Sequence, residues 1–216
     1  MKISVVRNIL EANERIAQQN REIFQANSLF VINLMSSPGA GKTSLLERTI
    51  DALKDSIKIG VIEGDIQSSV DAERISAKGV PAVQINTDGA CHLDGNMIRS
   101  TFGEFNFSEM GLLVVENVGN LVCPAEFNVG EDCKAMILSV TEGDDKPSKY
   151  PLMFHESKVL LINKIDLLPY VDCSVEKIKK DSLTINPDLT IFQVSCKTGE
   201  GLDAWYDWLR RQVKKK

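Results

Sequence analysis

The chain has 216 residues, of which 43% are hydrophobic and 25% are charged, so it can bury the core of one domain, and disorder is excluded as its overall state. The formal net charge of −5 disfavours a general nucleic-acid binder, no apolar run approaches the roughly 18 residues of a membrane helix, and the five scattered cysteines do not form a disulfide framework. These properties predict an acidic, soluble, single-domain protein that lies in the cytoplasm and has no nucleic-acid or membrane partner.

The first element is expected to be a helix over residues 1–27, where apolar pairs recur at seven-residue steps with polar residues between them. This pattern is typical of an amphipathic helix. Two interpretations stay open: the helix packs on the edge of the domain, which we favour, or it binds a partner or a second copy of the chain. Residues 28–216 are expected to form the main domain.

From residue 29 onward, short apolar strands alternate with helical segments, and strands such as AMILSV and VLLIN are apolar at consecutive positions, which is typical of strands covered on both faces. The pattern predicts an α/β fold with a mainly parallel, doubly wound sheet. The segment Glu142–His155 contains two prolines and mixed charge, and it is expected to be a mobile loop. The expected strands are Leu29–Ser36, Ile57–Glu63, Pro81–Asn86, Gly111–Glu116, Cys133–Val140, Lys158–Asn163 and Thr190–Ser195, and the expected helices are Lys42–Lys54, Ser69–Lys78, His92–Phe102, Ser174–Leu183 and Leu202–Lys214.

A phosphate-binding loop is predicted between the first strand and the helix that follows it. The sequence SSPGAGKT has the Gly-Lys-Thr ending of a P-loop, in the strand–loop–helix setting that a P-loop requires. Lys42 is expected to reach the β- and γ-phosphates, and the Thr43 hydroxyl to bind Mg²⁺. Ser36 stands where the strict pattern has glycine, which is a small departure. The predicted phosphate-binding residues are Ser37, Pro38, Gly39, Ala40, Gly41, Lys42, Thr43 and Ser44.

Acidic residues at two further strand ends complete the predicted magnesium side of this site. Glu116 precedes Asn117-Val118-Gly119 at the position where most GTPases have aspartate, and Gly119 is expected to give a backbone N–H to the γ-phosphate. Asp65 is the first choice for the other acid, with Asp71 as the alternative. Asn120 falls where small GTPases often carry a water-orienting glutamine, and because asparagine is shorter, we expect slow intrinsic GTP turnover.

A second cluster consists of Cys91, His92 and Cys123. Thiolate and imidazole are ligands for Zn²⁺, Ni²⁺ or Cu⁺ rather than for Mg²⁺. A cysteine–histidine pair with one distant cysteine is by itself more often structural. The position of Cys123, four residues past Gly119, favours a metal site whose geometry depends on the nucleotide. Three ligands would leave an open position or need a second subunit.

The base of the nucleotide is predicted from two strand ends near the C-terminus. Asp166 in Asn163-Lys164-Ile165-Asp166 can accept two hydrogen bonds from guanine that adenine cannot supply, while Lys164 lies along the base and Asn163 braces the loop. The later loop formed by Ser195, Cys196 and Lys197 is expected to close over the base. A P-loop followed by this motif predicts GTP as the nucleotide.

Taken together, the motifs SSPGAGKT, EGDIQSSVDAERI, CHLD, ENVGNLVCP, TEGDDKP, NKIDLLP and SCKTGEG resemble the hydrogenase nickel-incorporation GTPases, the HypB-type maturation proteins. The resemblance implies a P-loop GTPase of the dimerising SIMIBI class that delivers nickel to [NiFe]-hydrogenase precursors. It also implies a homodimer, a zinc-containing HypA-type nickel chaperone and the hydrogenase large-subunit precursor as partners. The family's metal residues correspond to Cys91, His92 and Cys123, and whether Ni²⁺ or Zn²⁺ fills the site stays open.

Two departures limit this resemblance. No N-terminal cysteine motif or histidine-rich tract is present, so we expect no separate N-terminal nickel site, and Ser37 stands where many dimerising relatives have an extra lysine. Three alternatives stay open: a nickel-delivery GTPase for urease, a GTPase chaperone for a cobalamin enzyme, and a metal storage or sensor module whose P-loop only binds nucleotide. Urease GTPases typically have Cys-Pro-His at the metal site, whereas Cys91 and His92 are adjacent here.

Overall fold

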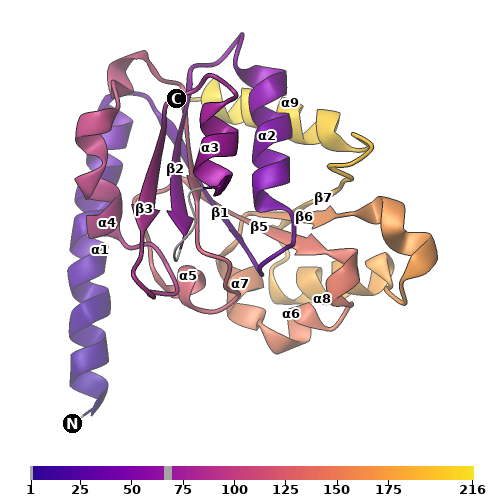
Figure 1. Ribbon diagram of the computed structural model, residues 1–216. Coiled ribbons are helices and arrows are strands. Elements are labelled where there is room, and N and C mark those ends of the chain that lie inside the picture. The colour runs from indigo at the N-terminus through magenta and orange to yellow at the C-terminus, as the bar shows by residue number, and fades with distance from the viewer. Residues whose placement is uncertain (1, 66–69) are drawn as a thin grey trace.

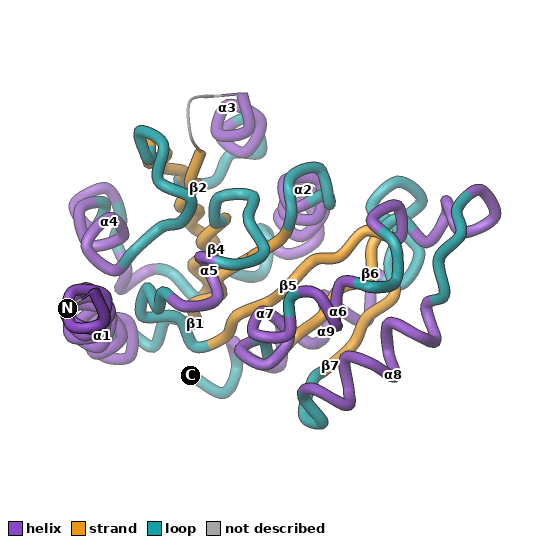
Figure 2. The backbone as a smooth tube through the Cα atoms, turned by 90° about the horizontal axis from the view of Figure 1, so that it is seen from below, coloured by secondary structure: helices purple, strands orange, loops and turns teal. Residues whose placement is uncertain are grey.

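A computed structural model describes residues 2–65 and 70–216, with side chains for residues 9–65 and 73–216. Within these residues, seven strands form one sheet in the order β3-β2-β4-β1-β5-β6-β7, and the neighbouring strands pair in parallel (Figures 1 and 2). The strands are β1 (Phe30–Ser36), β2 (Ile59–Asp65), β3 (Ala82–Asn86), β4 (Leu112–Glu116), β5 (Cys133–Ser139), β6 (Val159–Asn163) and β7 (Thr190–Gln193). The predicted doubly wound α/β fold is therefore confirmed.

Helices cover both faces of the sheet (Figure 2). One face packs against α2 (Lys42–Leu53), α3 (Val70–Ser76) and α9 (Leu202–Val213). The other face carries α1 (Lys2–Ala26), α4 (Gly95–Ser100), α5 (Cys123–Glu126), α6 (Lys146–Lys149), α7 (Pro151–Glu156) and α8 (Val175–Ile185). Short 3₁₀ helices lie at Phe102–Glu104, Phe107–Glu109, Val140–Glu142 and Ile165–Tyr170.

The central strand β1 shows why these residues form a two-sided layer. Every residue of β1 is buried, and alternate side chains point to opposite faces. Ile32 and Leu34 pack with α2 and α9, whereas Val31 packs on the other side with Phe24 of α1. Such a strand is apolar at consecutive positions because neither of its faces meets water.

Two expectations about local structure were wrong. The segment Glu142–His155 is not a loop, because most of it lies in α6 and α7, and the side chains of Met153 and Phe154 are buried. Its two prolines lie in the first turns of these helices, where a missing N–H costs no hydrogen bond. The helix expected to begin at His92 begins instead at Gly95, because the Asp94 side chain caps it by accepting from the N–H of Met97.

The N-terminal helix α1 forms as predicted and lies beside α4 (Figure 1). Its packed face includes Ala17 and Phe24, which are buried, while its N-terminal end projects beyond the sheet. Across residues 2–65 and 70–216, no helix has both the length and the apolar character of a membrane span.

Candidate functional site: a nucleotide pocket beside a cysteine–histidine cluster

A cavity of about 510 Å³ opens at the carboxyl ends of β1, β2 and β4. In parallel α/β sheets, ligands bind at this edge, where loops and helix N-termini converge. The cavity takes in most of the predicted phosphate-side residues. Its lining consists of Pro38, Gly39, Gly41, Lys42, Thr43, Ser44, Glu63, Gly64, Asp65, Arg74, Glu116, Asn117, Val118, Gly119 and Lys164.

The predicted P-loop curls around one end of this cavity. Gly39 and Gly41 have φ values of 76° and 105°, a left-handed conformation that favours glycine. Asn163 at the end of β6 donates to the carbonyl of Ala40 at 2.9 Å, and the Lys164 ammonium donates to the carbonyl of Gly39 at 2.7 Å. The segment that begins at Asn163 therefore contacts the predicted P-loop through two hydrogen bonds.

Oxygen ligands gather on the side of the cavity where magnesium is expected. The Thr43 hydroxyl donates to a Glu116 carboxylate oxygen at 2.8 Å, and Asp65 lines the same cavity. Hydroxyl and carboxylate oxygens are the ligands that Mg²⁺ prefers, so this set fits the ion. The side chain of Asp71, the alternative acid, lies outside the described residues.

Glu63 is a site residue that sequence analysis missed. It is buried on β2, lines the cavity, and pairs in register with Glu116 on β4. A carboxylate directly after the apolar run IGVI of this strand was the signal, because charged residues are rarely buried without a functional or structural reason.

All of the predicted base-binding residues except Ser195 line a neighbouring pocket of about 400 Å³. The Ser195 hydroxyl donates to Asp166 at 2.5 Å, which orients the carboxylate expected to accept from guanine. The N–H of Cys196 donates to the Asn163 side chain at 3.2 Å, and burial raises the pKa of the Cys196 thiol to about 11. The pocket is lined by Gly41, Ser44, Asn163, Lys164, Asp166, Leu167, Cys196 and Lys197.

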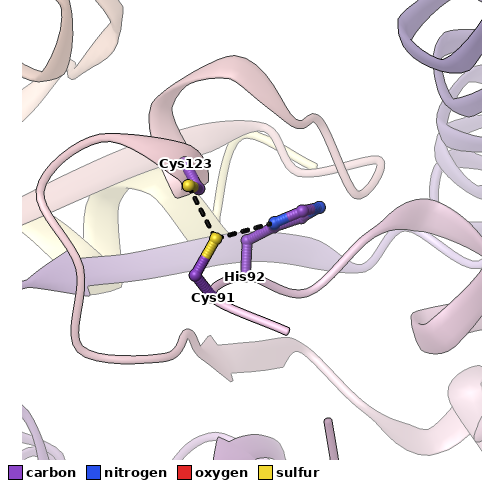
Figure 3. Close-up of side chains that lie close together, drawn as sticks. All are labelled: Cys91, His92 and Cys123. Atoms are coloured by element: carbon purple, nitrogen blue, oxygen red, sulfur yellow. Dashed lines mark hydrogen bonds between the residues drawn. The ribbon is translucent and has the colours of Figure 1, made fainter. Parts of the chain in front are cut away.

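The structure brings Cys123 next to the adjacent Cys91 and His92, although Cys123 lies on a separate segment of the chain (Figure 3). Their ligand atoms all lie within 4.8 Å of one another, with 2.7 Å between the two sulfurs and 3.7 Å between Cys91 Sγ and His92 Nδ1. All three side chains are partly buried. Two thiols and one imidazole suit a borderline or soft transition metal and leave a position open for a further ligand.

The surroundings of this cluster bear on the protonation of its groups. Burial lowers the pKa of His92, whose ring stacks on Phe127 with centroids 3.7 Å apart, so the imidazole favours the neutral, metal-binding form. Burial and the hydrogen bond with Cys91 raise the pKa of the Cys123 thiol to about 11. A bound metal would therefore release a proton from Cys123.

One short segment connects the cavity to the cluster. Asn117 follows Glu116 at the end of β4, and its side-chain oxygen accepts from the N–H of Leu93, the residue after His92, at 3.0 Å. Asn120 accepts from the N–H of Val122 at 2.7 Å and lies 3.8 Å from the Cys123 sulfur. Asn120, which is predicted to take the place of a water-orienting glutamine, therefore lies against the cluster of Cys91, His92 and Cys123.

Gly119 packs directly on the phosphate loop. A Cβ added there would lie 3.0–3.1 Å from atoms of Pro38, so glycine allows a close approach of the two backbones. The segment from Glu116 to Cys123 thus touches the phosphate loop at one end and carries a thiol ligand at the other. Sequence analysis predicted this proximity but not the role of Asn117.

Comparison with known proteins agrees with this site. Residues 30–193 match the family described as CobW/HypB/UreG, nucleotide-binding domain. The hydrogenase maturation factor HypB of Azotobacter vinelandii is 52% identical over 210 residues, which cover 97% of this chain and 69% of that protein.

Two solved structures are similar along nearly the whole chain. The crystal structure of hydrogenase maturation factor HypB from Archaeoglobus fulgidus has 41% identity and a TM-score of 0.88, and it covers 94% of this chain and 99% of its own. The crystal structure of HypB from Helicobacter pylori in complex with nickel has 38% identity and a TM-score of 0.88, covering 94% and 96%. The fold is that of the P-loop GTPases of the SIMIBI class, and the chain belongs to the HypB hydrogenase maturation factors of the CobW/HypB/UreG family.

Proposed function

We propose that this protein is a GTP-hydrolysing metallochaperone that delivers nickel during [NiFe]-hydrogenase maturation. The observation that carries the proposal is the segment Glu116–Cys123, which begins at the phosphate cavity and ends in the cluster of Cys91, His92 and Cys123. The nickel complex of the similar Helicobacter pylori protein supports nickel as the cargo. Cysteine ligands of this kind act as thiolates, which favours a reducing compartment such as the cytoplasm.

Hydrolysis would take place at the phosphate end of the cavity. Thr43, Asp65 and Glu116 would hold Mg²⁺, which supplies charge neutralisation on the phosphates when bound. Lys42 would bind the β- and γ-phosphates, and the backbone N–H of Gly119 would position the γ-phosphate. Intrinsic turnover is expected to be slow, because Asn120 is shorter than the water-orienting glutamine of small GTPases.

The nucleotide would control the metal through this same segment. When the γ-phosphate is lost, the N–H of Gly119 loses the group that it would bind. The segment Glu116–Cys123 would then relax, and this segment carries Cys123 at its other end. Asn117 connects the same movement to Leu93 and hence to the backbone beside His92. GTP and metal then favour the same closed state, as thermodynamic coupling requires.

A second copy of the chain would complete the metal site. Three ligands leave a coordination position open, and Val122 beside Cys123 is half exposed. We therefore propose a homodimer closed by GTP and metal. A HypA-type chaperone and the hydrogenase large-subunit precursor would be the further partners.

The decisive experiment is a titration of Ni²⁺ and of Zn²⁺ in the presence of GDP and then of a non-hydrolysable GTP analogue. We expect wild-type affinity for Ni²⁺ to differ between the two nucleotides and Cys123→Ala to lose most of the binding. Cys173→Ala is the matched control, because Cys173 lies in the hydrophobic cluster around α8, away from the metal residues. Equal Ni²⁺ affinity with both nucleotides in wild type would remove the proposed switch.

Phosphate release separates an enzyme from a storage or sensor module that only binds nucleotide. We expect slow, steady release of phosphate from GTP by wild type and none above background by Lys42→Ala, because Lys42 would neutralise charge on the phosphates. Release at the same rate from both proteins would point to a contaminating enzyme and would contradict the assignment.

A further inference from the structure

Two buried asparagines on α1 contact the segments that follow the Cys91–His92 pair and Cys123. Asn13 and Asn20 lie seven residues apart, about two helical turns, so they point from the same face of the helix. Asn13 is 7% exposed and Asn20 is fully buried. Buried amides are usually hydrogen-bonded, and here both atoms of the Asn13 amide and the Nδ2 of Asn20 bond to backbone groups of two other segments.

Each asparagine joins the same two segments. Asn13 accepts from the N–H of Gly95 at 2.8 Å and donates to the carbonyl of Asn128 at 2.9 Å. Asn20 donates to the carbonyl of Gly95 at 2.7 Å and to that of Val129 at 3.2 Å. Gly95 comes three residues after His92, and Asn128 comes five residues after Cys123, so four hydrogen bonds tie both halves of the metal cluster to one helix.

The backbones approach α1 more closely than side chains would allow. A Cβ added to Gly95 would lie 3.1 Å from the N of Ala17, and one added to Gly130 would lie 2.8 Å from Cβ of Asn20 and 3.0 Å from O of Ala17. Gly130 also has a φ of 104°, which favours glycine. Gly95 and Gly130 thus allow their backbones to pack closely against Ala17, and the hydrogen bonds of Asn13 and Asn20 hold the two segments in place on α1.

We propose that Asn13 and Asn20 are positioning residues that set the separation between Cys91–His92 and Cys123, so that docking of α1 and binding of the metal are coupled. The proposal rests on the proposed function, because it takes these three residues as the metal ligands. It gives the metal site a second control in addition to the nucleotide: any ligand or partner that loosens the packed half of α1 would weaken metal binding.

Short segments connect the two anchored sites to the proposed metal ligands, so a movement of α1 can reach these ligands. Asp94, which caps α4, is the only residue between Leu93 and Gly95, and Leu93 is itself held by Asn117. On the other side, α5 begins at Cys123, and the buried Lys134 ammonium donates to the carbonyl of Ala125 in this helix at 2.7 Å. A displacement of either anchor on α1 therefore moves a ligand-bearing segment.

The test compares Asn13→Leu and Asn20→Leu with Gln25→Leu, a matched amide-to-leucine change on the exposed side of the same helix. Ni²⁺ is titrated and followed by the thiolate-to-nickel absorption band, and guanine nucleotide affinity is measured in parallel. Loss of a hydrogen bond made directly to a metal ligand weakens metal sites by roughly 10–100-fold, and we expect the lower end of this range for anchors that act through the backbone. We expect at least a tenfold weaker Ni²⁺ affinity for Asn13→Leu, with nucleotide affinity unchanged and Gln25→Leu like wild type.

A second measurement on the wild type covers the case in which Asn20→Leu fails to fold. Coupling is reciprocal, so Ni²⁺ should slow backbone hydrogen exchange in residues 13–24 of α1. Wild-type Ni²⁺ affinity retained within twofold in Asn13→Leu, or exchange in α1 that Ni²⁺ leaves unchanged, would overturn the coupling while leaving the proposed function intact. A wild type that binds no Ni²⁺ would instead contradict the proposed function and this inference with it.

Discussion

At the scale of single residues, a chain of buried polar side chains runs beneath the site. Asn117 donates to Asn33 at 3.1 Å, and Asn33, in the middle of β1, donates to Glu131 at 3.2 Å. The Glu131 carboxylate lies 3.9 Å from the Lys134 ammonium. These groups lie in a low-dielectric interior, where each unmade hydrogen bond is costly, so the chain fixes one arrangement of the segments around the metal cluster.

Lys134 gives this interior a pH dependence that can be measured. Burial lowers the pKa of Lys134 below its ordinary 10.5, although Glu131 opposes the shift. Between the lowered pKa and 10.5 the unfolded chain binds more protons than the folded one, so the contribution of Lys134 to stability rises with pH across this window and is lost as pH falls through the folded pKa.

We expect the stability of wild type relative to Lys134→Met to increase between pH 7 and pH 10. Urea unfolding of both proteins over this range measures the difference. The buried thiol of Cys133, whose pKa burial raises to about 12, is common to both proteins and cancels. A stability difference between the two proteins that stays constant with pH would contradict the lowered pKa of the buried Lys134 ammonium.

In the proposed function, the Asp166 carboxylate determines the selectivity of the site for guanine over other bases. In Asp166→Asn the acceptor for two guanine donors is replaced by an amide, and we expect affinity for GTP to fall and affinity for XTP to rise, each by about 10–100-fold from the loss of a charged hydrogen bond. Displacement of a fluorescent nucleotide by GTP and by XTP measures both. Asp172→Asn, an exposed change nearby, is the control. A variant that keeps its preference for guanine would count against the base assignment.

At the scale of elements, α2 and α9 are joined by one buried hydrogen bond. Trp205 Nε1 donates to the Thr49 hydroxyl at 3.0 Å, and that hydroxyl donates to the carbonyl of Leu45. Thr49→Val keeps the shape but leaves the indole N–H unsatisfied, so we expect a loss of about 1–3 kcal/mol in the free energy of unfolding. Urea unfolding followed by tryptophan fluorescence measures it.

Thr184→Val is the matched control for this change. Thr184 also donates to a carbonyl four residues earlier, but its side chain is exposed on α8. Within the described residues, no tryptophan donates a hydrogen bond to it. We expect its effect to stay within about 0.5 kcal/mol. Equal losses in the two variants would assign the effect to the helix backbone contact instead of the bond between α2 and α9.

The elements themselves were largely predictable, but their ends were not. Apolar runs predicted the central residues of the strands. The start of α4 was predicted at His92, but the helix begins after Asp94, because the Asp94 side chain caps it. Pro147 and Pro151 predicted a loop, yet each lies in the first turn of a helix. Burial of Met153 and Phe154 stabilises this segment as a helix and outweighs the preference of the two prolines for a loop.

At the scale of the whole molecule, a bound metal should stabilise the fold, because its ligands come from segments that separate on unfolding. Ni²⁺ at a hundred times its dissociation constant adds about 2.7 kcal/mol, and for a chain of this size we expect the unfolding midpoint to rise by roughly 5–10 °C. A chelator should reverse the shift. Cys123→Ala should abolish it, while Cys173→Ala should not. An unchanged midpoint in wild type would argue against a site formed by the folded chain.

The sequence by itself determined the fold class, the nucleotide loop and the three candidate metal residues, because these follow from short-range spacing: a Gly-Lys-Thr turn at a strand end, consecutive apolar positions, and a Cys-His pair. Only the tertiary structure decided that Cys123 meets Cys91, that Glu63 lies beside Glu116, and that Asn13 and Asn20 anchor the segments that follow His92 and Cys123. These contacts join residues from 32 to 115 positions apart, and no local pattern encodes which buried amide will face which backbone group. That choice is made when helices pack on the sheet, because a buried polar group that lacks a partner is costly.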